Sequence, residues 1–213
     1  MAQIARRQDV RQARPEISEE TIIQAAQRGE LAAFNQLVLK YQEMAYNVAY
    51  RVLGDPDSAA DATQDSFLKA YRALREFRGG TFKFWLLRIV INTCYDQLRA
   101  QQRHPTTSLE DLAVDSEHAS HLVQRGADPE EYALREELYA LIQAGIQSLP
   151  EEQRITLVLA DIEGFSYQEI AEITGVQLGT VKSRLSRARW HLRDFLRARA
   201  ELLPQRYRPT GED

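Results

Sequence analysis

The chain has 213 residues, of which 44% are hydrophobic and 27% charged, so it can bury one large or two small cores and is not disordered throughout. No apolar run approaches the roughly 20 residues of a membrane-spanning helix, and the polar, arginine-rich N-terminus does not look like a secretory signal, so we expect a cytoplasmic protein without membrane insertion. The net charge is −4, and the single cysteine, Cys94, excludes an intramolecular disulfide and a multi-cysteine zinc site.

The first half of the chain has helical periodicity and weak strand signals. Apolar residues recur at three- and four-residue steps between residues 34 and 52, which predicts one buried helical face that ends at Gly54. Asp55-Pro56 then predicts a helix start, with aspartate as the N-cap and proline at the first helical position. Gly79-Gly80 breaks the pattern before a long helix expected over about residues 82–103.

Residues 104–132 are predicted to form a flexible acidic linker, because large apolar residues are scarce there. The acidity extends to residue 152: residues 104–152 contain eleven acidic residues and two arginines, a net charge of −9. In residues 177–208, nine basic residues face two acidic ones, a net charge of +7. Such asymmetry indicates a nucleic-acid-binding end and a separate acidic segment.

The C-terminal region has the pattern of a helix-turn-helix. Ser166 and Glu169 have capping-box spacing, which predicts the start of a short helix that runs to Thr174. Gly175 lies at the turn, where a positive φ is easiest for glycine. A basic helix follows over about residues 178–197.

This basic helix has two faces. Val181, Leu185 and Ala188 follow alternating steps of four and three residues and are expected to pack inward. The outer surface carries hydroxyl groups and arginines that suit guanine edges and phosphates. The simpler interpretation is a solvated basic helix, but the capped helix and glycine turn favour binding in the major groove. The candidate DNA-binding residues are Thr180, Lys182, Ser183, Arg184 and Arg187.

Three motifs in this half together resemble a known family. Leu149–Arg154, Gly164–Ala171 and Gly179–Arg189 closely resemble the fourth domain of extracytoplasmic-function (ECF) sigma factors, group 4 of the sigma-70 family. The resemblance implies that the helix-turn-helix reads the −35 promoter element. Gln177 stands where the family often has a proline.

The first half resembles the same family in two segments. Asp61–Arg72 resembles the helix of the second sigma domain that docks on the clamp of core RNA polymerase. This resemblance implies polymerase contacts by Asp61, Gln64, Asp65 and Phe67. Without it, Phe67 would be assigned to the core and the other three to an ordinary polar face.

Phe77–Ile89 resembles the part of the family that melts DNA and reads the −10 element. Its chemistry fits that task, since aromatic rings among cations can replace base stacking in a separated strand. The alternative is that most of these rings are core residues. With the helix that follows, the resemblance implies a −10 surface of Arg78, Phe82, Arg88, Asn92 and Arg99.

We therefore expect an all-α protein of two small helical domains, of sigma-2 and sigma-4 type. The expected divisions are an N-terminal extension (1–17), a sigma-2-like domain (18–103), an acidic linker (104–132), a sigma-4-like domain (133–200) and a C-terminal tail (201–213). The resemblance implies an alternative sigma factor that binds the clamp and flap of core RNA polymerase, recognises duplex and melted promoter DNA, and is controlled by an anti-sigma factor.

No phosphate-binding loop, nucleophile-base pair or metal cluster is recognisable in the sequence, so we expect neither an enzyme nor a bound cofactor or metal. The remaining alternative is a conventional helix-turn-helix transcriptional regulator. That alternative accounts for residues 166–197 but gives no role to the two sigma-like segments of the first half.

Overall fold

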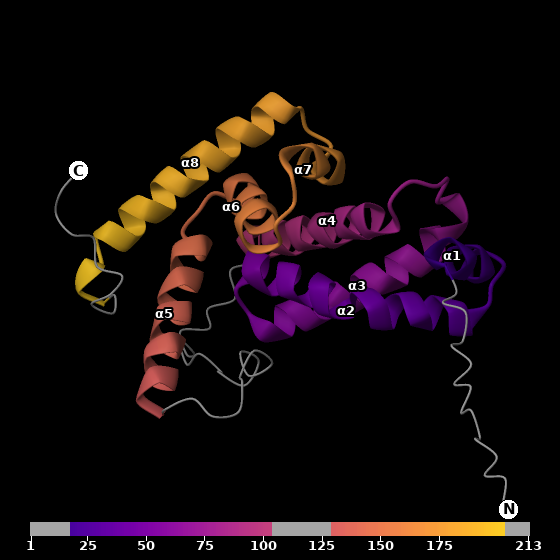
Figure 1. Cartoon of the computed structure of the whole chain (residues 1–213), viewed down its shortest axis with the longest axis horizontal. Coiled ribbons are helices and arrows are strands. Elements are labelled where there is room, and N and C mark those ends of the chain that lie inside the picture. The colour runs from indigo at the N-terminus through magenta and orange to yellow at the C-terminus, as the bar shows by residue number, and fades with distance from the viewer. Residues whose placement is uncertain (1–17, 104–128, 203–213) are drawn as a thin grey trace, which may run out of the picture.

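The computed structural model describes residues 18–103 and 129–202, and within these ranges the chain is helical without strands, as predicted. The expected N-terminal extension, most of the acidic linker and most of the C-terminal tail lie outside the described residues. We call residues 18–103 the first domain and residues 129–202 the second domain (Figure 1).

The first domain contains four α-helices and one short 3-10 turn. They are α1 (Glu19–Gln27), α2 (Leu31–Leu53), α3 (Pro56–Ala73), η1 (Leu74–Glu76) and α4 (Phe82–Arg103). The second domain contains α5 (Pro129–Gln147), α6 (Glu151–Leu157), the π-helical turn η3 (Val158–Ile162), α7 (Tyr167–Thr174), α8 (Leu178–Arg197) and the 3-10 turn η4 (Ala200–Leu202). Helix α5 begins at Pro129, four residues before the expected start of the sigma-4-like domain.

The boundary between α2 and α3 forms as its sequence predicts. Gly54 takes the left-handed conformation, with φ of 84°, and its N–H donates to the carbonyl of Tyr50 (2.8 Å). Asp55 then caps α3, since its Oδ2 accepts from the Ser58 N–H (2.7 Å), and Pro56 occupies the first helical position. The two helices are therefore joined by a connection that returns α3 along α2.

The core of the first domain lies between α2, α3 and α4, with α1 packed on α2. Its largest fully buried side chains include Leu37, Leu74 and Phe82. Helix α1 is fastened by polar contacts as well: Glu19 accepts from the Tyr41 hydroxyl (2.6 Å) and pairs with Lys40. These contacts bind the N-terminal helix to the middle of α2.

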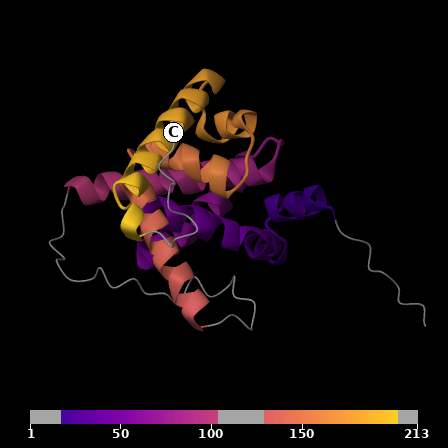
Figure 2. The ribbon, with the colours of Figure 1, turned by 60° about the vertical axis from the view of Figure 1, so that its left-hand side comes forward.

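The second domain packs on the first rather than standing apart from it. Helix α7 packs against α4, and α5 and α6 meet the C-terminal end of α2 (Figures 1 and 2). Apolar side chains of the second domain, including Ile155, Phe165 and Ile173, belong to the same buried cluster as the core of the first domain. The sequence did not predict this docking.

The end of α2 shows how closely the domains fit. The last carbonyls of a helix lack the N–H of a following turn, and here side chains of the second domain donate to three carbonyls at this end, including that of Tyr50, which also accepts from Gly54. The bonds run from Gln143 to Tyr50 (3.3 Å), from Gln147 to Arg51 (2.9 Å) and from Arg154 to Val52 (2.6 Å). Gly54 lies directly beside this contact: a Cβ at position 54 would stand 2.7 Å from Cδ of Gln147.

Candidate nucleic-acid interface

The helix-turn-helix of the second domain is built by its caps. The Ser166 hydroxyl accepts from the Glu169 N–H (3.3 Å), and the Glu169 carboxylate accepts from the Ser166 N–H (2.7 Å), which completes the predicted capping box. These hydrogen bonds lower the pKa of Glu169. Gly175 ends α7 with φ of 71°, so the chain turns directly into α8.

Helix α8 has the two faces that the sequence predicts. Val181, Leu185 and Ala188 are buried against the rest of the domain. Of the candidate DNA-binding residues, Lys182 and Arg187 are exposed, while Thr180, Ser183 and Arg184 are partly covered. All five lie in the first ten residues of α8. That is the end a recognition helix presents to bases.

Two arginines of α8 are engaged within the second domain. Arg184 forms an ion pair with Glu152 of α6 (2.5 Å), which leaves its side chain 17% exposed. Arg189 binds Asp161 of η3 through two nitrogens. Both pairs join α8 to preceding elements of its own domain, Arg184 to α6 and Arg189 to η3.

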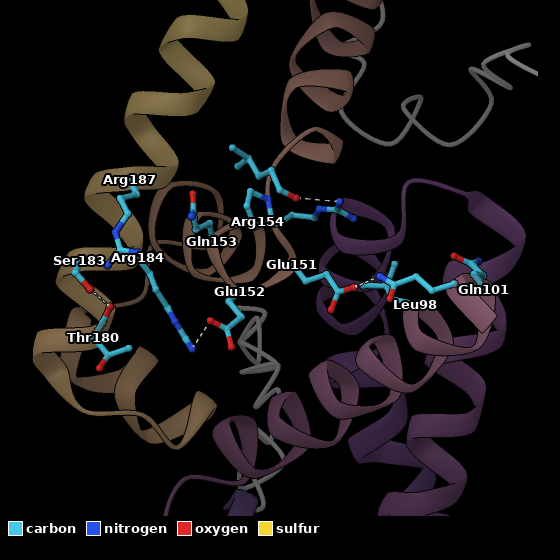
Figure 3. Close-up of a pocket in the computed structure, with 13 residues that line it drawn as sticks. Leu98, Gln101, Glu151, Glu152, Gln153, Arg154, Thr180, Ser183, Arg184 and Arg187 are labelled. Atoms are coloured by element: carbon cyan, nitrogen blue, oxygen red, sulfur yellow. Dashed lines mark hydrogen bonds and ion pairs between the residues drawn. The ribbon is translucent and has the colours of Figure 1, made fainter. Parts of the chain in front are cut away.

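The candidate surface of α8 faces a pocket of about 900 Å³ between the two domains (Figure 3). One wall is formed by Thr180, Ser183, Arg184 and Arg187 of α8. The other sides are formed by Leu98, Gln101 and Gln102 of α4 and by residues 149–154 around the start of α6. Gln102 also donates a hydrogen bond to Glu151 across the domain boundary (2.7 Å).

The outer stripe of α4 is mostly placed as expected. Arg88, Asn92 and Arg99 are exposed, and Arg78 is exposed just before the Gly79-Gly80 turn. The Arg99 guanidinium lies 5.9 Å from the ring centroid of Tyr95 on the same helix. Helical spacing puts Arg88, Asn92 and Arg99 on one stripe of α4, and Arg78 adds an exposed cation in the segment before the helix.

Phe82 differs from its expected place. Its ring is 1% exposed and packs against Tyr41, Phe77 and Trp85, with centroid separations of 5.6, 5.8 and 5.5 Å. The structure thus places it in the core, where packing holds the start of α4, and not on the −10 surface. Phe84, in the same segment, contacts the second domain: its ring centroid lies 5.8 Å from that of Phe165.

Helix α3 carries the candidate polymerase-binding residues. Asp61, Gln64 and Asp65 are exposed on one side of the helix, as expected. Phe67 is 8% exposed and belongs to the core cluster, so its ring is not an available anchor for a partner in this structure. The helical step places it on the face of α3 opposite the acidic side chains.

Two apolar side chains on α3 were not among the sequence candidates. Leu68 and Tyr71 are 47% and 42% exposed, one helical turn apart. The ring centroid of Tyr71 lies 4.9 Å from that of Phe34 on α2, so the apolar surface around Tyr71 continues from α3 onto α2. Exposed large apolar side chains that gather on one face are typical of interaction surfaces. The sequence did not identify Leu68 and Tyr71 as a surface pair, because apolar residues three apart on a helix are equally typical of a buried face.

Other kinds of site find no support in the described residues. Within residues 18–103 and 129–202, no group of three or more histidine, cysteine or acidic side chains is placed so that it could hold a metal ion. Within those same ranges, none of the helices combines the length and apolar character that crossing a bilayer requires. Cys94 is fully buried, and burial raises the pKa of its thiol to about 12.

Family models match both halves of the chain. Residues 37–104 match the model described as Sigma-70 region 2, and residues 139–192 match the model described as Sigma-70, region 4. The two matches fall in the first and second domains and leave the acidic linker between them.

Curated relatives are similar over most of their length. The chain is 41% identical over 174 residues to the RNA polymerase sigma-H factor of Pseudomonas aeruginosa, covering 80% of this chain and 90% of that protein. It is 39% identical over 180 residues to the ECF RNA polymerase sigma-E factor of Salmonella typhimurium, covering 82% and 92%.

A solved structure shares the fold. The sigma factor RpoE of Bartonella quintana, in complex with the anti-sigma factor NepR, has a TM-score of 0.59 and 29% sequence identity to this chain. The comparison covers 76% of this chain and 96% of that chain.

Proposed function

The chain belongs to the sigma-70 family of RNA polymerase sigma factors and is of the ECF type. On this basis we propose which of its residues recognise each promoter element and which bind polymerase. The observation that carries the proposal is the pair of family matches in one chain, region 2 followed by region 4. A conventional helix-turn-helix regulator would not account for the region 2 match.

The second domain is proposed to bind the −35 element as duplex DNA. Its contacts come from Thr180, Lys182, Ser183, Arg184 and Arg187 at the start of α8. An arginine can bind O6 and N7 of guanine with two hydrogen bonds, whereas lysine suits a phosphate. The capped α7 and the Gly175 turn support this assignment, because they fix the angle at which α8 leaves the domain.

The first domain is proposed to bind the −10 element and to hold a separated strand. Arg78, Arg88, Asn92 and Arg99 are its contacts, and their exposure supports the assignment. The guanidinium groups can neutralise phosphates or bind a guanine edge, and the Asn92 amide can bind an adenine edge. Promoter opening then uses binding energy, while phosphoryl transfer is left to polymerase and this chain contributes no catalytic residue.

The proposed partners are core RNA polymerase and an anti-sigma factor. Asp61, Gln64 and Asp65 on α3 are proposed to bind the polymerase clamp, together with the neighbouring apolar face of Leu68 and Tyr71. The second domain would contact the flap. Control by an anti-sigma factor is supported by the relative from Bartonella quintana, which was solved with one bound. A cytoplasmic location is proposed with them, because a sigma factor acts on polymerase and promoter DNA.

Run-off transcription tests the proposal. Purified core polymerase is supplied with a promoter library, with and without the protein. We expect transcripts that begin downstream of a shared pair of motifs only when the protein is present. Direct binding of duplex DNA, without core binding and without new transcripts, would instead favour a conventional regulator.

A further inference from the structure

The loop between η1 and α4 is open to solvent at its middle. We call residues 78–81 the −10 loop, because Arg78 belongs to the proposed −10 surface. All four residues are exposed, and Gly79 and Gly80 have φ of 103° and 90°. In the part of the chain that the structure describes, no atom beyond the adjoining residues lies within 4 Å of the place a Cβ would take at either glycine. The position of such an open, glycine-rich loop depends on what holds its ends.

Gln27 holds the beginning of this loop from another helix. It is the last residue of α1, and its side-chain Nε2 donates to the carbonyls of Leu74 (3.1 Å) and Phe77 (2.9 Å). A primary amide nitrogen has two hydrogens, so both of its donors are used here. The Phe77 carbonyl belongs to the planar peptide group that joins Phe77 to Arg78. The Gln27 amide therefore fixes the peptide group from which Arg78 extends.

The end of the −10 loop is connected to α1 as well. Phe82 begins α4 and is buried, and its ring centroid lies 5.6 Å from that of Tyr41. The Tyr41 hydroxyl donates to Glu19 at the start of α1. Helix α1 is therefore tied to both ends of the loop, directly through Gln27 and indirectly through Tyr41, and Figure 1 shows it at the same end of the first domain.

We propose that Gln27 is a positioning residue for promoter opening: its amide holds the peptide group before Arg78, so that this arginine is presented to a separated DNA strand. The inference rests on the proposed function of Arg78, through which Gln27 acts. Two consecutive glycines after Arg78 give the loop unusual backbone freedom, so an anchor on its first peptide group limits the conformations it can take. Without that anchor, the affinity for the strand falls by the fraction of molecules in the binding conformation.

Gln27→Met tests the role of the two donors. Methionine is also unbranched and uncharged, but it lacks both N–H groups. The probe is a labelled single-stranded oligonucleotide with the −10 sequence that the run-off library returns, bound to polymerase holoenzyme and followed by fluorescence anisotropy. We expect the affinity for this strand to fall about 3- to 10-fold, with holoenzyme assembly and affinity for the −35 duplex unchanged. The matched control is Gln24→Met, an exposed glutamine one turn earlier on α1.

A double-mutant cycle separates positioning from a general loss of stability. Strand affinity is compared for Gln27→Met, Arg78→Ala and the double variant. If Gln27 acts through Arg78, its replacement should cost less than about twofold once Arg78 is absent. Additive losses would overturn the inference, and so would full strand affinity in Gln27→Met beside a loss in Arg78→Ala. Full affinity in Arg78→Ala would instead remove Arg78 from the proposed −10 surface, and the inference with it.

Tryptophan fluorescence reports on the start of the loop itself. The chain has two tryptophans: Trp85 packs on Phe77, with ring centroids 5.3 Å apart, and Trp190 is exposed on α8. In a Trp190→Phe background, Gln27→Met should increase the quenching of Trp85 by acrylamide without loss of helical content, because the Phe77 peptide group is released. Unchanged quenching together with lowered strand affinity would mean that Gln27 contacts the strand itself, and would overturn the positioning role.

Discussion

Arg189 of α8 and Asp161 of the π-helical turn form a two-pronged ion pair, with Nε–Oδ2 of 2.9 Å and Nη2–Oδ1 of 2.6 Å. The hydrogen bonds to Asp161 raise the pKa of Arg189 above its usual value. In the sequence, Arg189 looks like one more cation of the recognition helix. The ion pair instead holds its guanidinium against η3 of its own domain, away from the pocket that Arg184 and Arg187 line.

Replacing Arg189 is therefore expected to affect stability more than promoter recognition. Arg189→Ala should lower the free energy of unfolding by about 0.2–1 kcal/mol, because both partners are partly exposed and solvent screens the pair. Urea denaturation of Arg189→Ala, Asp161→Ala and the double variant measures the coupling. Strictly additive effects of the two changes would contradict a stabilising pair, and the coupling should weaken as salt is added.

Arg184→Ala and Arg187→Ala are expected to weaken promoter binding. Each loses about 1–3 kcal/mol if its guanidinium binds a guanine with two hydrogen bonds, and base preference at the contacted position should relax. Competition binding of polymerase bearing each variant, on promoters changed one base at a time, measures both effects. Arg197→Ala, at the far end of the same helix, is the matched control. Unchanged affinity in both test variants would remove these residues from the −35 surface.

Acid is expected to loosen α1 through Glu19. Burial opposes the charge on Glu19, but hydrogen bonds from Lys40 and Tyr41 outweigh it and lower the pKa of this carboxyl below 4.5. A lowered folded-state pKa means that the stabilisation is present above the unfolded value of 4.5 and is lost as the pH falls through the folded value. Urea denaturation above and below pH 4.5 should show a smaller loss of stability in Glu19→Gln than in the wild type. An identical pH dependence in both would show that Glu19 does not carry the effect.

Cys94 is expected to be inert in the folded protein. Burial excludes reagents and raises the pKa of its thiol to about 12, so at neutral pH almost none of it is the reactive thiolate. Labelling with a thiol reagent should proceed slowly without denaturant and quickly in urea, at a rate set by opening of the first domain. Rapid labelling under native conditions would indicate that α4 separates from α3 more readily than this packing implies.

Loss of the α7 cap is expected to destabilise the second domain. Ser166→Ala removes the acceptor for the Glu169 N–H and should cost about 1 kcal/mol. Ser166→Asp is the control, since aspartate also caps helices well. Thermal unfolding followed by circular dichroism measures both variants. Equal destabilisation by the two substitutions would mean that the loss comes from something other than the cap.

Much of the fold could be predicted because its signals are local. The capping box at Ser166, the glycine at 175 and the Asp55-Pro56 start each depend on a few neighbouring residues, and the structure has all three where the sequence placed them. The bounds of α4 and α8 follow from the same kind of signal. Local backbone preferences and apolar periodicity are sufficient for such elements.

Contacts between distant segments could not be predicted in this way. Phe67 and Phe82 were candidates for partner contact, but a buried aromatic ring and an exposed one look the same in a sequence. Gln143 and Arg154 read as ordinary polar residues of a surface. Their role at the end of α2 depends on a carbonyl about a hundred residues away, which no spacing rule reveals.

Gly54 and Gln147 have a consequence for how this sequence can change over evolution. The glycine ends α2, yet the side chain that a larger residue would strike belongs to the other domain. A larger residue at position 54 would therefore strain the left-handed turn and push the Gln147 amide away from the Arg51 carbonyl, a displacement that a smaller residue at position 147 would avoid. Among related chains that keep this docking, the two positions should vary together, although 92 residues and the whole acidic linker separate one helix end from the other.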